Sequence, residues 1–120
     1  MRYSDLIEKV KIYSGFSDDE SKDAIDCLVE TLAVRLSEPE RKDFAEHLPD
    51  ELKGMALSVY PSDENSRPDI LRQFMVFQHV NAGRARKQFL SAWQALKDTV
   101  SVKEIERIRT QLPKLNHLLR

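Results

Sequence analysis

The sequence predicts an all-α protein, and three observations lead to that prediction. Glycine and proline number only 3 and 5 in a chain of 120 residues, too few for the many tight turns of an all-β fold. Apolar residues recur at helical spacing along most of the chain, whereas a sustained alternation of apolar and polar residues is found nowhere. The helical pattern also occurs twice. We therefore expect a helical bundle built from two copies of a three- to four-helix motif in a pseudo-twofold arrangement.

The internal repeat is seen when residues 1–56 are aligned without a gap on residues 65–120, an offset of 64 positions. Only six of the 56 aligned pairs are identical, but many more pair one apolar residue with another. Such apolar pairs include Leu6/Ile70, Val10/Phe74, Tyr13/Phe77, Ile25/Phe89 and Val29/Trp93. Because a repeat of this size is marginal as an independent domain, we predict a single domain over residues 1–120, with a linker at 57–64.

Periodicity places the helices in order along each repeat. The first helix has Leu6, Ile7, Val10 and Tyr13 on one face, which we expect to contact the core. The second is the longest and has the clearest apolar stripe. The expected helices span 4–14, 18–36, 38–47 and 49–59 in the first repeat, and 69–79, 83–99, 102–111 and 113–119 in the second.

Capping boxes indicate where three of these helices begin. In a Ser-x-x-Glu box the serine oxygen accepts a hydrogen bond from a backbone N–H of the first helical turn, and the glutamate reaches back to the serine N–H. The sequence contains this pattern at Ser17/Glu20, Ser37/Glu40 and Ser101/Glu104. Two of the boxes stand at equivalent positions of the repeats, which supports the internal duplication.

A Leu-Pro pair follows each of those two boxes, as Leu48-Pro49 and as Leu112-Pro113. Proline ends a helix because it lacks an N–H and its ring crowds the preceding turn. It is well suited to the first position of a new helix. We therefore expect each leucine to be a core residue at the end of one helix, and each proline to open the next.

Three segments, YSDLIEKV, EPERKDFAEHLP and EIERIRTQLP, carry a resemblance that extends over essentially the whole chain. They resemble the bacterial domain-of-unknown-function family numbered 2267, whose members are short, helical and internally duplicated, with a helix that closes on Gln-Leu-Pro in the second half. The segment at 104–113 is the most similar, whereas residues 77–88 are more basic than the family pattern. The resemblance implies a helical fold and no catalytic residue, because no activity is established for the family.

Residues that commonly carry chemistry are few. The three histidines, His47, His79 and His117, are not spaced as metal ligands, and no cysteine or carboxylate completes a ligand set. Cys27 has acidic neighbours, whereas a reactive thiol needs a basic environment. We therefore predict no catalytic residue, no cofactor and no metal site, and interpret the histidines as surface or helix-end residues.

Two further features have structural interpretations. One is a group of carboxylates without EF-hand spacing, which suits the positive end of a helix. The group consists of Asp18, Asp19, Glu20, Asp23 and Asp26. The other is Trp93, which aligns with Val29 on a core stripe and is interpreted as a buried anchor.

Charge differs strongly between the two halves. Residues 1–60 contain 8 Lys/Arg and 14 Asp/Glu, a net charge of −6, whereas residues 61–120 contain 11 and 6, a net charge of +5. The acidic start of the helix at 18–36 aligns with a basic stretch that contains Arg84, Arg86 and Lys87. This charge difference could arise by chance on two solvated faces. It could also reflect an internal electrostatic match, a docking face or an anion site. We take this stretch as the candidate docking or anion-binding surface.

Composition favours a cytoplasmic protein without membrane association, since the chain has one cysteine, no apolar signal core and no apolar run of about 18 residues. The preferred function is a non-enzymatic protein-interaction or regulatory module that binds an unknown protein partner or itself. Two alternatives stay open. One is an enzyme whose site has no motif. The other, disfavoured by a net charge of −1, is binding of nucleic acid or an anion through Arg84, Arg86, Lys87, Arg107 and Arg109.

Overall fold

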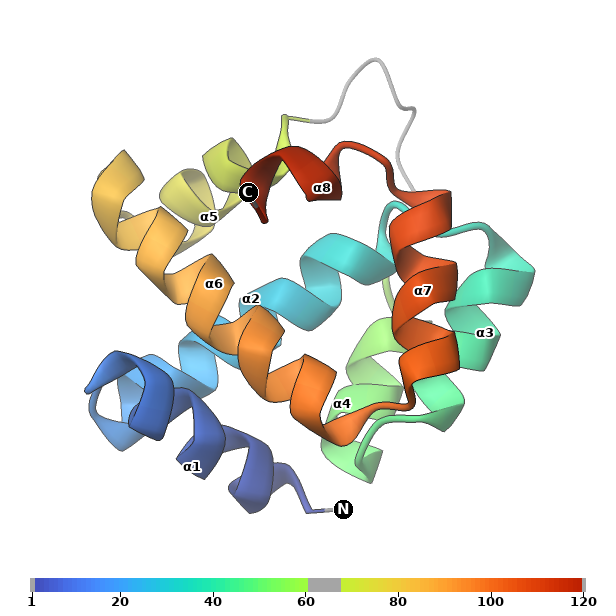
Figure 1. The fold of residues 1–120 in the computed structure, drawn as a ribbon, viewed down its shortest axis with the longest axis horizontal. Coiled ribbons are helices and arrows are strands. Elements are labelled where there is room, and N and C mark those ends of the chain that lie inside the picture. The colour runs from blue at the N-terminus through green and yellow to red at the C-terminus, as the bar shows by residue number, and fades with distance from the viewer. Residues whose placement is uncertain (1, 61–67, 120) are drawn as a thin grey trace.

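The structure is a computed structural model that describes residues 2–60 and 68–119. Every helix or strand assigned within those residues is an α-helix (Figure 1), so the predicted all-α fold is confirmed. Residues 57–60 of the predicted linker are described, and the first of them, Leu57, still belongs to α4, whereas 61–64 lie outside the described residues. In chain order the helices are α1 (Tyr3–Ser14), α2 (Asp18–Ala33), α3 (Glu38–Glu46), α4 (Asp50–Leu57), α5 (Ile70–Gln78), α6 (Ala82–Thr99), α7 (Val102–Gln111) and α8 (Leu115–Leu118).

The helices of the two repeats begin at corresponding positions. Helix α2 begins at Asp18 and α6 at Ala82, while α3 begins at Glu38 and α7 at Val102, so that both pairs of starts are separated by the same 64 positions. The order and the approximate lengths of the helices thus follow the repeat in the sequence. The pseudo-twofold relation in space stays a prediction.

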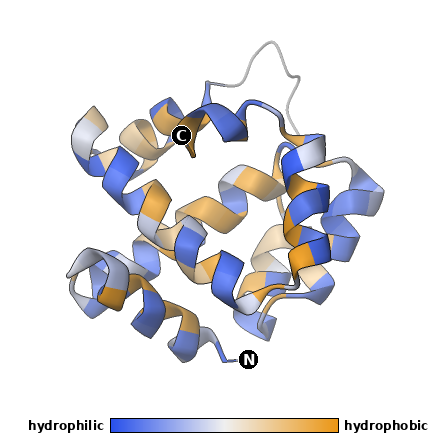
Figure 2. Cartoon of the chain, viewed as in Figure 1, coloured by the Kyte–Doolittle hydropathy of each residue, from blue (hydrophilic) through white to orange (hydrophobic). Residues whose placement is uncertain are grey.

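The two longest helices, α2 and α6, contact each other in the middle of the molecule (Figure 1). Helix α1 packs against both of them, and so does α5, so each of these shorter helices joins the long helices of the two repeats. A single cluster of buried residues runs through both repeats. Figure 2 shows the hydrophobic stretch of α2 at the centre of the view, among more polar outer helices.

Aromatic side chains form part of this core. The Phe89 ring packs edge-on against Phe74, with ring centroids 5.9 Å apart, and is stacked with Trp93 at 6.5 Å. Trp93 is only 4% exposed, so its interpretation as a buried anchor is confirmed.

The predicted capping boxes are complete at one helix and partial at two. Ser17 and Glu20 form both expected hydrogen bonds at the start of α2. At α3 and α7 the serine caps the helix, but no return bond from the glutamate side chain forms within the described residues. Arg107 attracts both of these glutamates instead, with guanidinium nitrogens 3.6 Å from Glu40 and 3.5 Å from Glu104. Arg107 lies in a different helix from Glu40 but in the same helix as Glu104, three positions away, so a charged side chain replaces the local bond in both boxes.

Several helix ends differ from the prediction by one to three residues, and two of them have a clear cause. Helix α2 ends at Ala33 and not at Leu36, because the chain turns there and the buried Arg41 donates hydrogen bonds to the carbonyl oxygens of both residues, each at 2.9 Å. Helix α6 begins one residue early, because the Asn81 side chain accepts the backbone N–H of Arg84 at 2.8 Å and caps the helix. The capping asparagine was overlooked in the sequence pattern.

The Leu-Pro corners are confirmed in their main feature and corrected in one detail. Leu48 and Leu112 are buried, with 7% and 9% of their surfaces exposed. Pro49, however, precedes the first residue of α4 as its N-cap, with an extended ψ of 156°, and Pro113 stands two positions before α8. Each proline therefore lies between two helices and is not the first residue of the second one.

Candidate functional site

The basic stretch proposed from the sequence lies against the segment that joins α1 to α2. The Arg84 guanidinium carbon is 4.1 Å from the centroid of the Phe16 ring, and Lys87 Nζ is 5.3 Å from the same centroid. Arg84 also donates a hydrogen bond to Glu20. Arg86 is exposed and makes a contact of its own. Arg84 and Lys87 therefore bind the first repeat, as an internal electrostatic match requires, while the docking and anion-binding interpretations stay predictions.

Two ion pairs between the repeats join positions that are 64 residues apart, the offset of the sequence repeat. They are Glu20 with Arg84, and Asp43 with Arg107, whose nitrogen and oxygen atoms are 2.6 Å apart. A twofold axis brings equivalent positions together, so both pairs lie where the predicted axis would pass. The hydrogen bond from the Ser17 backbone, and then Arg84, hold the pKa of Glu20 below its ordinary value. Opposite charges meet where two identical repeats would bring like charges together.

The histidines are not brought together. His47, at the end of α3, has its Nε2 atom 3.5 Å from an oxygen of Glu104, a carboxylate that is only 2% exposed. His79 ends α5 and His117 lies in α8. Across residues 2–60 and 68–119, no group of three or more histidine, cysteine, aspartate or glutamate side chains is arranged to hold a metal ion.

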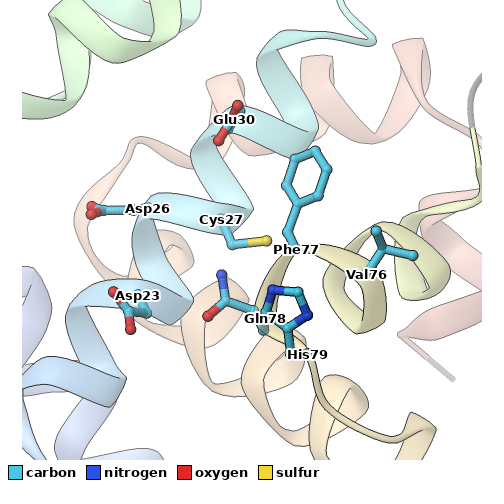
Figure 3. Close-up of a pocket in the computed structure, with 8 residues that line it drawn as sticks. All are labelled: Asp23, Asp26, Cys27, Glu30, Val76, Phe77, Gln78 and His79. Carbon is cyan, nitrogen blue, oxygen red and sulfur yellow. The ribbon is translucent and has the colours of Figure 1, made fainter.

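The site that the sequence did not reveal is an open groove between α2 and the end of α5 (Figure 3), called the α2/α5 groove below. Its volume of about 420 Å³ is at the smaller end of the range of roughly 300–1,000 Å³ typical of ligand sites. One face of α2 and the last turn of α5 line it. The lining residues are Asp23, Asp26, Cys27, Glu30, Val76, Phe77, Gln78 and His79.

The apolar part of the groove is exposed. Val76 and Phe77 are neighbours at the end of α5 and have 54% and 49% of their surfaces exposed. We had expected the aligned Tyr13 to contact the core, but it is 46% exposed, and its neighbour Ile12 is 72% exposed. The core-face prediction for Tyr13 is therefore wrong. Adjacent residues of a helix point about 100° apart, so the ends of α1 and α5 place an apolar pair partly outside the core.

The two exposed aromatic residues have different surroundings. The hydroxyl group of Tyr13 donates a hydrogen bond to Asp98 of α6, which also accepts one from Gln94 at 3.2 Å and lies 3.9 Å from Lys9 Nζ. We call this contact the Tyr13–Asp98 latch. Phe77 has no hydroxyl group, and the residue that aligns with Asp98 is Val34. The end of α5 therefore has no equivalent of the latch.

The acidic wall of the groove is only partly neutralised within the molecule. Asp26 accepts hydrogen bonds from Lys22, at 2.9 Å, and from the hydroxyl group of Tyr3. Among the described residues, Asp23 and Glu30 form no ion pair and no side-chain hydrogen bond. They are seven positions apart on α2 and line the same groove, so two carboxylates without a cationic partner lie beside the apolar pair.

Cys27 forms part of the groove lining but is not a reactive thiol. Its side chain is buried, and its sulfur atom lies 3.9 Å from the hydroxyl oxygen of Thr31. Burial raises the pKa of the Cys27 thiol to about 11, which keeps it protonated at neutral pH. The structural interpretation of this cysteine agrees with that environment.

His79 occupies an unusual backbone conformation at the rim of the groove. Its φ angle is 54°, in the left-handed region, and it is the one non-glycine residue of the described chain with a positive φ. The aligned residue in the first repeat is Gly15, with a φ angle of 76°. A glycine would adopt this conformation without strain, so the second repeat maintains a side chain where the first has none.

Hollows of similar size also lie between α1 and α4, at about 490 Å³, and beside α7, at about 400 Å³. Neither is lined by a large, exposed apolar side chain. The α2/α5 groove is therefore the hollow that combines an exposed apolar surface with carboxylates lacking a partner.

Comparison with known proteins supports the resemblance seen in the sequence. A family model described as "Uncharacterized conserved protein (DUF2267)" matches residues 3–118. No curated protein and no solved structure matches the chain. Within the described residues, none of the helices has both the length and the apolar character needed to span a membrane.

Proposed function

We propose a function from the groove itself, because the chain belongs to the DUF2267 family and the description of that family names no activity. The protein is a non-enzymatic interaction module, and the α2/α5 groove is the surface through which it binds a protein partner. The observation that carries this proposal is the pair of exposed apolar residues, Val76 and Phe77, next to carboxylates that have no cationic partner in the described chain.

The chemistry of the groove supports binding over catalysis. Its one thiol, Cys27, is protonated at neutral pH because burial raises its pKa. The groove is open to solvent, so bound groups would stay in contact with water, whereas active sites generally exclude it. An exposed apolar surface bordered by polar groups is typical of a protein–protein contact.

Site-specific photo-crosslinking tests the proposal. A photoreactive phenylalanine analogue is placed at Phe77 in the groove and, as a matched control, at Tyr13, which is the aligned position and is similarly exposed. We expect discrete adducts from position 77 and few from position 13. Each captured protein is then purified, and its binding to the wild type and to Phe77→Ala is measured directly. Equal labelling from both positions, or binding that Phe77→Ala leaves intact, would contradict the proposal.

A further inference from the structure

From the charge and spacing of the groove we infer the class of its partner, an inference that rests on the proposed function. The α2/α5 groove binds a basic protein segment in which two lysine or arginine residues flank an apolar residue. The apolar residue contacts Val76 and Phe77, and the two cations pair with Asp23 and Glu30.

The first argument is charge complementarity. Lys22 and Tyr3 already satisfy Asp26, but Asp23 and Glu30 have no ion pair or side-chain hydrogen bond in the described chain. An acidic or neutral segment would leave both carboxylates without partners and bring them into a less polar environment, which is unfavourable. A basic segment supplies the opposite charges and therefore fits this surface best.

The second argument is the spacing of the carboxylates. Seven residues of an α-helix cover about 10 Å, so Asp23 and Glu30 stand about that distance apart along α2, with Cys27 between them. Lysines seven positions apart on a helical segment have the same spacing. One apolar side chain three or four positions after the first lysine lies on the same face of that helical segment, so it can face the end of α5.

The third argument comes from the aligned positions of the other repeat. Asp23 aligns with Lys87, which lies over the Phe16 ring, and Glu30 aligns with the uncharged Gln94, which donates to Asp98 within the latch. The corresponding surface of α6 therefore uses its polar groups inside the molecule. The acidic surface is therefore found where α2 meets α5, and the aligned surface of α6 does not share it.

Titration of the full-length protein with short peptides, followed by NMR, tests the inference. One probe carries two lysines seven positions apart with a leucine between them, and a matched probe has glutamates in place of both lysines. We expect the lysine probe to shift the amide signals of α2 and of the end of α5, and to bind less tightly as salt is added. We expect the glutamate probe to leave these signals unchanged.

Paired variants separate the charge effect from a general loss of binding. Asp23→Asn with Glu30→Gln should weaken binding of the lysine probe by about three- to tenfold, the effect of losing two exposed ion pairs. Asp19→Asn with Glu38→Gln removes the same net charge outside the groove and should leave the affinity unchanged. Phe77→Ala should weaken both the lysine probe and any protein that the crosslinking experiment identifies.

The possible results distinguish the inference from the proposed function. Equal binding of the lysine and glutamate probes at the groove would overturn the basic partner and leave the proposed interaction surface in place. Shifts that appear on concentrating the protein alone, at the groove and at Lys87, would show that a second molecule occupies the groove and would also overturn the inference. If neither probe binds there, the inference fails, while the proposed function is judged separately by crosslinking at position 77.

Discussion

The contact of α1 with α6 and the contact of α5 with α2 are built on the same plan but differ in how they end. In the first, the Tyr13–Asp98 latch joins the last turn of α1 to α6, and Gly15 ends the helix in the left-handed conformation. In the second, Phe77 has no latch, and His79 ends the helix in the same conformation at a cost in strain. One contact is closed by polar groups, and the other is left as a groove.

This difference shows that a shared core does not require equivalent surfaces. Most buried positions are apolar in both repeats, because each helix has to cover the same interior. The outer positions are under no such constraint, so one repeat uses them for internal bonds and the other leaves them exposed. We therefore look for function where the repeats differ, and for stability where they agree.

The largest effects should come from the corner leucines, where the repeats agree. Leu48→Ala and Leu112→Ala should each lower the free energy of unfolding by about 2–5 kcal/mol, because they remove buried side chains. Pro49→Ala and Pro113→Ala should cost about 1 kcal/mol or less, since a proline mainly restricts the unfolded chain. Urea unfolding checks this ranking, and prolines that cost more than leucines would show that our account of the corners is wrong.

A second test concerns a buried residue that only one repeat contains. Arg41→Met removes charge-assisted hydrogen bonds to the carbonyl oxygens of Ala33 and Leu36 and should cost about 1.5–3 kcal/mol. The aligned residue is Ile105, so Ile105→Met is the matched control, and it should cost less than about 1.5 kcal/mol. Equal losses in urea unfolding would mean that Arg41 acts through its packing and not through its hydrogen bonds.

The left-handed helix ends give effects of opposite sign. His79→Gly should stabilise the protein by about 1 kcal/mol, because it relieves the strain of a side chain at positive φ. Gly15→Ala should destabilise it by about the same amount, since no atom lies near the added methyl group and strain alone acts. Thermal melts measure both changes, and destabilisation by His79→Gly would show that the His79 side chain makes stabilising contacts in the groove.

Charge exchange tests the ion pairs that join aligned positions. Glu20→Arg alone places like charges together and should lower the melting temperature. The double variant Glu20→Arg with Arg84→Glu restores an opposite pair and should recover much of that loss. Salt should reduce the difference between the two variants, because the pair is partly exposed to solvent. Equal melting temperatures of the single and double variants at low salt would show that the pair does not couple the repeats.

The smallest effect is expected at the latch and depends on pH. Tyr13 first, and then Gln94 and Lys9, hold the pKa of Asp98 below its ordinary value. Folding therefore favours the ionised form of Asp98. The resulting stabilisation is fully present above the unfolded pKa of about 3.9, and it is lost as the pH falls through the lower pKa of the folded state. Tyr13→Phe, which imitates Phe77, should reduce this acid sensitivity. Urea midpoints measured between neutral pH and about pH 3 check it, with Phe77→Tyr as the control because the residue aligned with Asp98 is Val34.

Much of the fold could be predicted from the sequence because the signals are local. The Ser17 capping box, the apolar stripe of α2 and the Leu48-Pro49 corner each depend on residues within one or two helical turns. The end of α2 at Ala33 could not be predicted in that way, because Arg41, eight positions along the chain, satisfies the carbonyl oxygen of its last residue. Glu40 of the box at α3 likewise has its partner, Arg107, in another helix.

The candidate site was much less predictable. The basic stretch was visible as a contrast in charge, but its contact with Phe16 and Glu20 depends on how the repeats meet. The groove combines Asp23 and Glu30 with Val76 and Phe77, which are more than 40 positions away in the chain. One sequence signal could have indicated the groove, namely the adjacent apolar pair at the end of the first helix of each repeat. Two neighbouring positions of a helix cannot both face one core.

The sequence by itself determined the all-α class, the approximate helix bounds, the repeat and the residues of the core, because hydrophobic periodicity and capping act over a few residues. Only the tertiary structure decided that Tyr13 is latched and Phe77 is not, that Arg84 meets Glu20, and that two carboxylates of α2 border an apolar pair of α5. These features depend on the packing of helices from different repeats, and side chains far apart in the chain become neighbours only when that packing is complete.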